Sequence, residues 1–345
     1  MSLYSFWTQI FPPRNGALLT EANLPSQNAK VYIVTGGSSG LGYELSRILY
    51  GAGAKVYILT RSKEHAESAI SRIRGYYAAN SAEHQTQSPT RGSLVFVSMD
   101  LEDFNTVKAA AEGFLQLEGP DGRLDGLFNN AGTGARSNAP PSRQGHEYHF
   151  STNSIGHFLL TRLLMPILSK TASSSPSDSV RVVWSASLLV DAMAPKGGIR
   201  KEFLENTQIV KDPYELYAMT KTASWFLASE FARREGSTGV VHLAGNPGNY
   251  DTNIWRHVPR LVYYLNWPIL RNPVHGAETY LWMGLSGSIT MDDAVSGRYA
   301  ICDGRWHPGQ REDILLALRT ADEGGTGLAS QYFNWCDKIV EDFLH

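Results

Sequence analysis

A tyrosine and a lysine stand four residues apart in the segment YAMTK, residues 217–221. Side chains at positions i and i+4 of a helix share one face, so the Tyr217 phenol and the Lys221 ammonium could meet at the same bound atom. A phenol titrates near ~10 when unperturbed, which is too high for an efficient proton shuttle at neutral pH. A neighbouring ammonium favours the phenolate and should lower the pKa of Tyr217. The pair predicts proton transfer at a substrate oxygen, although such spacing also arises by coincidence.

Two serine hydroxyls precede this pair in the chain. Ser185-Ala186-Ser187 closes an apolar run at residues 180–185 that reads as a strand. A hydroxyl at the end of that strand could hydrogen-bond the oxygen to which the proton is transferred. The two serines are therefore candidates for polarising the substrate oxygen.

A glycine-rich turn lies far upstream, at residues 35–42 (TGGSSGLG). It follows the apolar run KVYIVT, residues 30–35, and opens a segment whose leucines and isoleucine recur at helical spacing. Glycines let the backbone approach a pyrophosphate closely, and the helix that begins there points unpaired N–H groups at the phosphates. The strand–turn–helix context predicts a dinucleotide-binding turn.

The end of the second expected strand bears on which dinucleotide is bound. Sites for NAD usually place a carboxylate there to hold the ribose hydroxyls, whereas this strand ends in Thr60-Arg61-Ser62. Arg61 could pair with a 2′-phosphate, and Ser38 in the glycine turn could add a hydroxyl. The alternative is that Arg61 lies at the surface beside the strand end. We expect NADP(H) rather than NAD.

Strands and helices alternate along most of the chain, which predicts a Rossmann-type, doubly wound parallel α/β sheet. We expect one domain at residues 30–304, preceded by an N-terminal strap at 1–29 and followed by a C-terminal extension at 305–345. The polar residues 78–91 are expected to form a surface insertion. Strands are expected at 30–35, 54–60, 94–99, 124–129, 180–185, 240–244 and 297–302, and helices at 62–77, 107–117, 148–168 and 215–233.

Composition narrows the classes of partner. The 345 residues carry a formal net charge of -2, which gives no electrostatic reason to expect nucleic acid or an acidic membrane. Cys302 and Cys336 have no metal-ligand spacing around them, so we expect no metal and two free thiols in a reducing, cytoplasmic setting. No apolar run is long enough to span a bilayer. The aromatics of residues 1–13 are expected to pack onto the domain, with weak membrane contact as the alternative.

The chain resembles the short-chain dehydrogenase/reductase superfamily from about Lys30 to Cys302. Its length and the long gap before Tyr217 make it similar to the retinol-dehydrogenase-like branch and that branch's fungal relatives. The family's Thr-Gly-x-x-x-Gly-x-Gly turn matches residues 35–42, its Asn-Asn-Ala-Gly segment matches 129–132, and its Pro-Gly-x-x-x-Thr segment matches 247–252. With Arg61, the resemblance implies cofactor contacts from Gly36, Ser38, Ser39, Gly40, Leu41, Gly42, Asp100, Leu101, Asn130, Ala131, Gly132, Tyr217, Lys221, Pro247, Gly248, Tyr250 and Thr252.

The resemblance also implies a catalytic set of Asn153, Ser187, Tyr217 and Lys221, with Ser185 the less favoured serine. Tyr217 would donate the proton and Ser187 would polarise the oxygen. Lys221 would bind the nicotinamide ribose and, with Asn153, feed the proton relay. The implied activity is NADP(H)-dependent interconversion of a carbonyl and an alcohol. One departure weakens the NADP(H) prediction: relatives that use NADP often carry a basic residue near Ser38.

The substrate is expected beyond the carboxyl ends of the strands, where ligands of open α/β sheets bind. Two segments rich in apolar side chains, residues 188–216 and 253–273, would wall this space, although the second could equally be a core helix or an oligomer interface. They imply a medium-to-large, mostly apolar substrate, by analogy a fungal secondary metabolite. Reduction of an imine or other C=N or C=C bond and non-catalytic NADP sensing are the alternative functions. The family resemblance also allows a homodimer.

Overall fold

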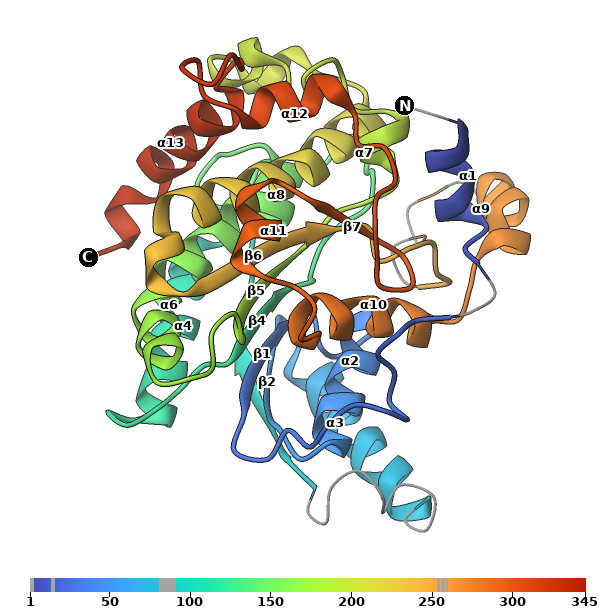
Figure 1. The fold of residues 1–345 in the computed structure, drawn as a ribbon, viewed down its shortest axis with the longest axis vertical. Coiled ribbons are helices and arrows are strands. Elements are labelled where there is room, and N and C mark those ends of the chain that lie inside the picture. Colours follow the sequence, from blue (N-terminus) through green and yellow to red (C-terminus); the bar gives the residue numbers. More distant parts are fainter. Residues whose placement is uncertain (1–2, 14–15, 81–90, 253–254, 256–257, 259) are drawn as a thin grey trace.

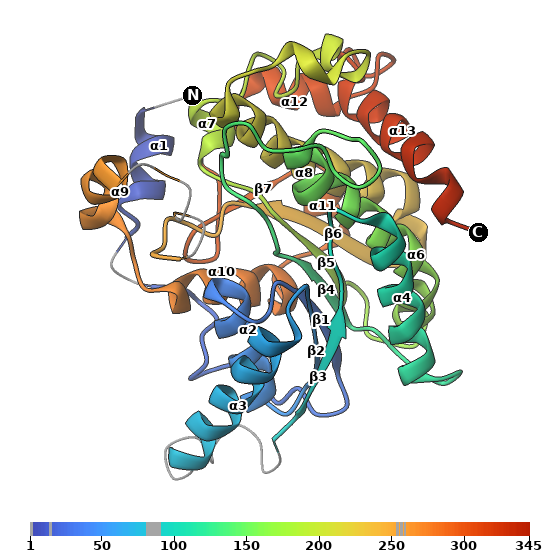
Figure 2. The same cartoon turned by 180° about the vertical axis from the view of Figure 1, so that it is seen from behind.

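Eight strands form one sheet in the order β3-β2-β1-β4-β5-β6-β7-β8, with helices on both faces (Figures 1 and 2). The computed structural model describes residues 3–13, 16–80, 91–252, 255, 258 and 260–345. Neighbouring strands from β3 to β7 pair in parallel, and β8 pairs antiparallel with β7. The predicted doubly wound α/β fold is confirmed. The strands are β1 Val31–Thr35, β2 Lys55–Thr60, β3 Ser93–Ser98, β4 Gly126–Asn129, β5 Val180–Ser185, β6 Val240–Gly245, β7 Tyr299–Ile301 and β8 Arg305–Trp306.

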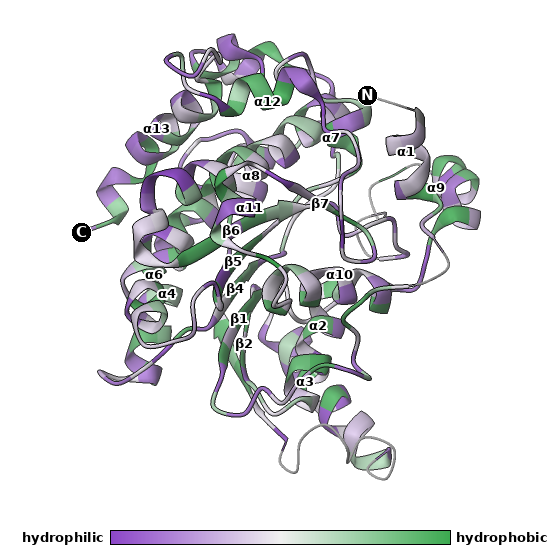
Figure 3. Ribbon diagram, viewed as in Figure 1, coloured by the Kyte–Doolittle hydropathy of each residue, from purple (hydrophilic) through white to green (hydrophobic). Residues whose placement is uncertain are grey.

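The central strands are buried on both faces and consist mostly of apolar residues (Figure 3). Every residue of β1, β4, β5 and β6 is buried. Alternate side chains of one strand therefore enter two different cores. In β1, Ile33 belongs to the core on one face and Tyr32 to the core on the other.

Two layers of helices complete these cores. Helices α2, α3 and α10 contribute to the core that contains Tyr32, and α4, α6, α8 and α13 contribute to the core that contains Ile33. The C-terminal residues 305–345 are part of this packing, since Tyr332 and Phe333 of α13 are fully buried. The helices are α1 Leu3–Ile10, α2 Gly40–Gly51, α3 Lys63–Ala79, α4 Phe104–Glu118, α5 Tyr148–Phe150, α6 Gly156–Ser173, α7 Leu189–Ala192, α8 Pro213–Glu235, α9 Arg260–Asn266, α10 Pro273–Leu285, α11 Met291–Val295, α12 Glu312–Leu318 and α13 Leu328–Val340.

The helix predicted over residues 148–168 differs from expectation in two ways. A π-helical turn at Ser151–Ile155 separates α5 from α6, and hydrophobic periodicity cannot reveal such a turn because it shifts the register by one residue. At its other end α6 continues to Ser173, beyond the predicted end of the helix at residue 168. Most of the expected surface insertion, residues 81–90, lies outside the described residues.

The N-terminal segment contradicts, for Tyr4 and Trp7, the expectation that its aromatics pack onto the domain, whereas Phe6 is half-buried. It forms α1, which exposes Tyr4 and Trp7 and buries Ser5, Thr8 and Gln9. The polar face is inside because it finds hydrogen-bond partners there; for example, the Arg305 guanidinium donates to the Thr8 hydroxyl and carbonyl, both at 2.8 Å.

Among the described residues, no helix combines the length and apolarity needed to cross a bilayer. Cys302 and Cys336 are buried free thiols, as predicted.

Candidate active site

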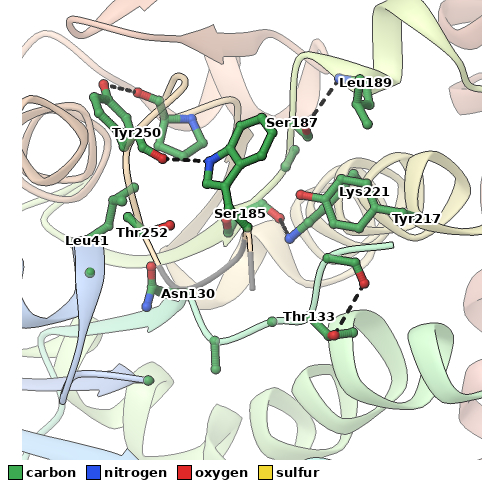
Figure 4. Close-up of a pocket in the computed structure, with 18 of the residues that line it drawn as sticks. Leu41, Asn130, Thr133, Ser185, Ser187, Leu189, Tyr217, Lys221, Tyr250 and Thr252 are labelled. Carbon is green, nitrogen blue, oxygen red and sulfur yellow. Dashed lines mark hydrogen bonds between the residues drawn. The ribbon is translucent and has the colours of Figure 1, made fainter. Parts of the chain in front are cut away.

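A cavity of about 590 Å³ opens at the carboxyl ends of the parallel strands (Figure 4). It is lined by residues that follow β1, β2, β3, β4, β5 and β6, because parallel strands bring these ends to one edge of the sheet. The cavity collects the predicted Ser187, Tyr217 and Lys221. It also collects every predicted cofactor residue except Ser38 and Gly42, while Asn153 lies just outside its lining.

The cavity has two sides: the cofactor wall carries residues expected to contact a dinucleotide, and the substrate wall carries residues expected to face the substrate. The cofactor wall comprises Gly36, Ser39, Gly40, Leu41, Arg61, Asp100, Leu101, Asn130, Ala131, Gly132, Pro247, Gly248, Tyr250 and Thr252; the substrate wall comprises Phe6, Ile10, Leu188, Leu189, Ala192, Met193, Tyr214, Trp255, Val258, Val262, Asn266, Ile269 and Leu270.

The glycine turn of the cofactor wall requires its glycines. Gly36 has a φ of +67°, and a Cβ on Gly42 would stand 2.5 Å from the Gly36 carbonyl oxygen. The Thr35 hydroxyl accepts hydrogen bonds from the backbone N–H groups of Asn130 and Ala131, both at 2.9 Å. These hydrogen bonds join the glycine turn directly to the Asn-Asn-Ala-Gly segment, which lies about a hundred residues later in the chain. Gly42 acts inside the turn rather than in the cavity wall.

The turn leads into the N-terminus of α2, which faces the cavity. Ser39 is the N-cap residue, and its side chain makes no capping hydrogen bond. No acidic residue lies in the first turn of the helix, so the positive end of its dipole is not offset there by a carboxylate. These features fit the phosphates of a dinucleotide.

The far end of the cofactor wall carries Arg61 beside two carboxylates. The Arg61 Nη1 atom lies 3.0 Å from Glu102 and 3.9 Å from Asp100, and its side chain is 56% exposed. The guanidinium is therefore paired with Glu102, but it is exposed enough to contact an anion at the cavity edge as well. Ser38 is turned away, since it is buried and its hydroxyl donates to the Thr60 hydroxyl at 3.4 Å.

Tyr217 and Lys221 project from the same face of α8 into the cavity (Figure 4). The Lys221 Nζ atom lies 5.6 Å from the centroid of the Tyr217 ring and donates to the Ser185 carbonyl at 3.1 Å. Burial raises the pKa of Tyr217 to about 12 and lowers the pKa of Lys221 to about 8. Desolvation dominates at both groups in the protein alone, so the pKa of the phenol rises there. Its lowering by the ammonium together with the positive ring of a bound oxidised nicotinamide stays a prediction for that complex.

The two candidate serines have different partners. The Ser187 side chain lies near the Tyr217 phenol, and its polar influence partly offsets the rise in the pKa of Tyr217. The Ser185 hydroxyl instead accepts a hydrogen bond from the Tyr280 hydroxyl at 2.9 Å. Tyr299 fixes the backbone at Ser187: its hydroxyl donates to the Ser187 carbonyl at 3.0 Å and accepts from the Ser187 N–H at 3.1 Å. The geometry therefore brings Ser187, rather than Ser185, against the tyrosine.

Asn153 lies in the π-helical turn behind Lys221. Its side-chain oxygen accepts from the Thr133 N–H at 2.8 Å, and its amide donates to the Thr133 carbonyl and the Thr220 hydroxyl, both at 3.1 Å. A Cβ on Gly132 would stand 3.0 Å from this oxygen and 3.6 Å from Lys221 Nζ. Asn153 thus lies close to Lys221, with its side chain fully engaged in orienting the neighbouring loop.

The segment after β6 forms the side of the cavity opposite Lys221 (Figure 4). Gly248 has a φ of +120°, which favours glycine, and the Tyr250 hydroxyl donates to the Pro247 carbonyl at 2.6 Å. The Trp255 indole donates to the Tyr250 carbonyl at 3.0 Å. A residue of the substrate wall thereby holds the backbone of the cofactor wall.

The substrate wall is built from three segments distant in sequence. Residues 188–216 and the described part of 253–273 both line the cavity, and α1 adds Phe6 and Ile10. Helices α1 and α9 lie side by side in both views (Figures 1 and 2). Among the described lining residues, the charged ones are Arg61, Asp100, Glu102 and Lys221, so the substrate wall itself carries no charge.

Phe6, Ile10 and Tyr299 were not predicted from the sequence, and Tyr214 was predicted only as part of the segment 188–216. Tyr214 had a usable signal, since it precedes Tyr217 by three residues and shares its face of α8. The other three had none, because their roles depend on contacts between distant segments.

Known proteins resemble this chain over nearly its whole length. The sequence pattern of the short chain dehydrogenase family matches residues 30–175. A short-chain dehydrogenase/reductase of Phomopsis amygdali is 40% identical over 99% of this chain and 98% of its own length. One from Neocamarosporium betae is 36% identical over 99% of this chain and 94% of its own length.

Solved structures share the fold. A protein from Mycobacterium paratuberculosis superposes with a TM-score of 0.64 at 24% identity, covering 93% of this chain and 97% of its own. The Pseudomonas aeruginosa RhlG/NADP complex superposes with a TM-score of 0.56 at 23% identity, covering 77% and 94%.

Proposed function

The chain belongs to the short-chain dehydrogenase/reductase superfamily, with fungal relatives, and from this premise we propose that it is an NADP(H)-dependent oxidoreductase that interconverts a carbonyl and an alcohol. The superfamily consists of oxidoreductases that use nicotinamide cofactors. The observation that carries the proposal is the convergence of Ser187, Tyr217 and Lys221 in one cavity with the glycine turn.

In this proposal the chain's own residues handle the substrate oxygen and its proton. A bound nicotinamide supplies or accepts the hydride. Tyr217 donates the proton in the reductive direction, and the raised pKa keeps the phenol protonated until the oxygen becomes basic. Ser187 donates a hydrogen bond to the same oxygen and stabilises its developing negative charge.

Lys221 has two roles in the proposal. It contacts the nicotinamide ribose, and its ammonium stabilises the phenolate left on Tyr217. Its low pKa lets it return a proton to that phenolate near neutral pH. Asn153 orients the loop at Thr133 beside it and supports the relay.

The preference for NADP(H) rests on Arg61. No carboxylate ends β2, and Arg61 lies at the cavity edge where a 2′-phosphate would be met. Neighbours in fold include complexes with NADP and NADPH, and others with NAD or NADH. The fold alone therefore does not decide the preference, and the guanidinium is the feature that favours NADP(H).

The substrate we propose is a medium-to-large, mostly apolar carbonyl compound or alcohol, of the kind that fungi make as secondary metabolites. The uncharged substrate wall supports this class, because an ionised substrate would lose hydration there without gaining a partner. The fungal relatives support the biological setting.

Oxidation of NADPH and NADH by the purified protein tests the proposal. Ketones, aldehydes, quinones and cyclic imines of increasing size would be offered, and carboxylated analogues would serve as matched controls. We expect turnover of apolar carbonyls with NADPH, weaker turnover with NADH, and little with the carboxylates. Preference for an imine would contradict the proposed reaction. Preference for an ionised substrate would contradict the proposed apolar pocket.

A further inference from the structure

A single side chain of the N-terminal helix connects the two walls of the cavity. Gln9 lies in the last turn of α1 and is 2% exposed. Helix α1 precedes the region that the family pattern matches, which begins at residue 30. The proposed mechanism uses no residue of this helix, yet both ends of the Gln9 carboxamide have partners beside the reacting centre.

The carboxamide oxygen faces the cofactor wall. It accepts a hydrogen bond from the Asn246 amide at 2.9 Å. The Asn246 side-chain oxygen in turn accepts from the Gly248 N–H at 3.0 Å. Gly248 has a positive φ and begins the turn that leads to Tyr250 and Thr252. Gln9 therefore orients the side chain that holds this turn.

The carboxamide nitrogen faces the substrate wall. It donates to the Asp191 carboxylate at 2.8 Å, and Asp191 lies in α7. That short helix begins at Leu189, and the Leu189 N–H donates to the Ser187 hydroxyl at 3.2 Å. A fixed Asp191 therefore fixes the helix that adjoins Ser187.

His307 shares the same carboxylate oxygen. Its Nδ1 atom accepts from the Gly309 N–H at 3.1 Å, which assigns the ring proton of the neutral tautomer to Nε2. Nε2 then donates to Asp191 at 2.8 Å. Gln9 and His307 thus both donate to one oxygen of the buried Asp191 carboxylate. The distance of 3.3 Å between Gln9 Nε2 and His307 Nε2 is therefore a contact between two donors.

We propose that Gln9 is a positioning residue of the active site, coupling the turn at Asn246–Gly248 to α7 and thereby to Ser187. The inference rests on the proposed function for its catalytic consequence, but the coupling itself is a property of the fold. Loss of the carboxamide leaves the Asn246 amide with one fewer acceptor and the Asp191 carboxylate with one fewer donor, both in a buried region. Each segment then relaxes independently, and the substrate oxygen and the cofactor lose their alignment.

The test compares Gln9→Met, which removes the amide at similar volume, with Thr8→Val as a matched control. Thr8→Val removes a hydrogen bond between α1 and Arg305 without contacting Asn246 or Asp191. Amide hydrogen exchange in the full chain would be followed by mass spectrometry. We expect exchange at residues 189–192 and at Gly248 to accelerate together, by ~5-fold or more, in Gln9→Met alone. Equal acceleration in both variants, or none in either segment, would overturn the coupling.

Kinetics with an apolar ketone gives the second readout. Gln9→Met should lower kcat by ~10–100-fold with less than ~3-fold change in the Kd of NADPH, because alignment rather than binding is lost. The positioning role would be refuted if Gln9→Met changed KM but not kcat, or if Thr8→Val lowered kcat as much as Gln9→Met does. If the unaltered protein turned over no carbonyl, the proposed function would fail, while the exchange experiment would still decide the coupling.

Discussion

The two walls of the cavity are built in different ways. The cofactor wall comes from short segments that each follow a strand, and its shape is set by backbone conformation, as at Gly36 and Gly248. The substrate wall comes from α1, α7, the start of α8 and the segment around α9, and its shape is set by side-chain contacts such as Trp255 with Tyr250. Backbone requirements leave local sequence motifs, whereas contacts between distant segments do not. One wall can therefore be recognised across a superfamily, while the other can diverge to fit different substrates.

The largest effect is expected where the two walls meet. Tyr217→Phe removes the proton donor without changing the shape of the cavity, and we expect turnover to fall by ~10²–10⁴-fold with NADPH binding retained. The matched control is Tyr214→Phe, which removes a phenol one turn earlier on the same helix and should keep most of the activity. Similar losses in the two variants, measured as kcat with the same ketone, would remove Tyr217 from its assigned role.

A defect confined to the cofactor wall should follow Gly42→Ala. The added Cβ would lie 2.5 Å from the Gly36 carbonyl and 2.6 Å from the Asn130 amide, so the turn must shift at a cost of ~1–3 kcal/mol. NADPH affinity, measured by fluorescence titration, should weaken by ~10–100-fold. Gly75→Ala in α3 is the control, because a Cβ there meets nothing within 4 Å. An unchanged affinity for NADPH would show that the turn does not bind it.

A defect confined to the substrate wall should follow Phe6→Ala. Loss of the ring removes apolar surface worth ~1.5–3 kcal/mol when fully buried, and Phe6 is partly buried, so we expect KM for an apolar ketone to rise by ~10-fold. The Kd of NADPH should stay constant. Trp7→Ala, on the outward face of the same helix, should change neither constant. If Phe6→Ala weakened NADPH binding instead, Phe6 would belong to the cofactor side of the cavity rather than to the substrate wall.

Arg61→Ala should change the choice of cofactor only. Loss of a charge-assisted contact to the 2′-phosphate is worth ~1.5–3 kcal/mol, and the exposure of Arg61 places the effect at the lower end. KM for NADPH should rise by ~10-fold while KM for NADH stays unchanged. Lys63→Ala, which removes an exposed cation two residues away, should affect neither cofactor. Equal losses with both cofactors would contradict a phosphate contact.

The smallest effect expected is the pH dependence of turnover. Burial lowers the pKa of Lys221 to about 8, so its ammonium is lost as the pH rises through that value. Tyr217, with its pKa raised to about 12, stays protonated over the same range. Carbonyl reduction should be constant at lower pH and decline above about pH 8, as the cation that stabilises the phenolate disappears. A reductive rate that rises with pH would contradict this assignment, and Lys221→Met should abolish the decline.

The sequence predicted individual residues of the cofactor wall, but it predicted the substrate wall only as two segments, 188–216 and 253–273, without helix α1. Alternating apolar runs predicted the sheet, and the Thr-Gly, Asn-Asn-Ala-Gly and Pro-Gly segments predicted residues that the structure brings to the cavity. The π-helical turn at Asn153 was missed because it interrupts the 3.6-residue period within a continuous helix.

Helix α1 was misread for a different reason. Its aromatic residues suggested burial, but the partners of its polar face, Arg305, Asn246 and Asp191, are hundreds of residues away. The direction of the pKa shifts at Tyr217 and Lys221 was also inaccessible, because it depends on burial that only the folded chain shows.

Isotope transfer tests most directly whether the cavity carries out hydride transfer to a carbonyl. The protein would be incubated with an apolar ketone and NADPH that carries deuterium at one face of nicotinamide C4, and the alcohol would be analysed by mass spectrometry and NMR. The account predicts one deuterium on the carbinol carbon from one labelled face and none from the other. An unlabelled alcohol from both labelled forms of NADPH, or deuterium at any other carbon of the alcohol, would contradict the account.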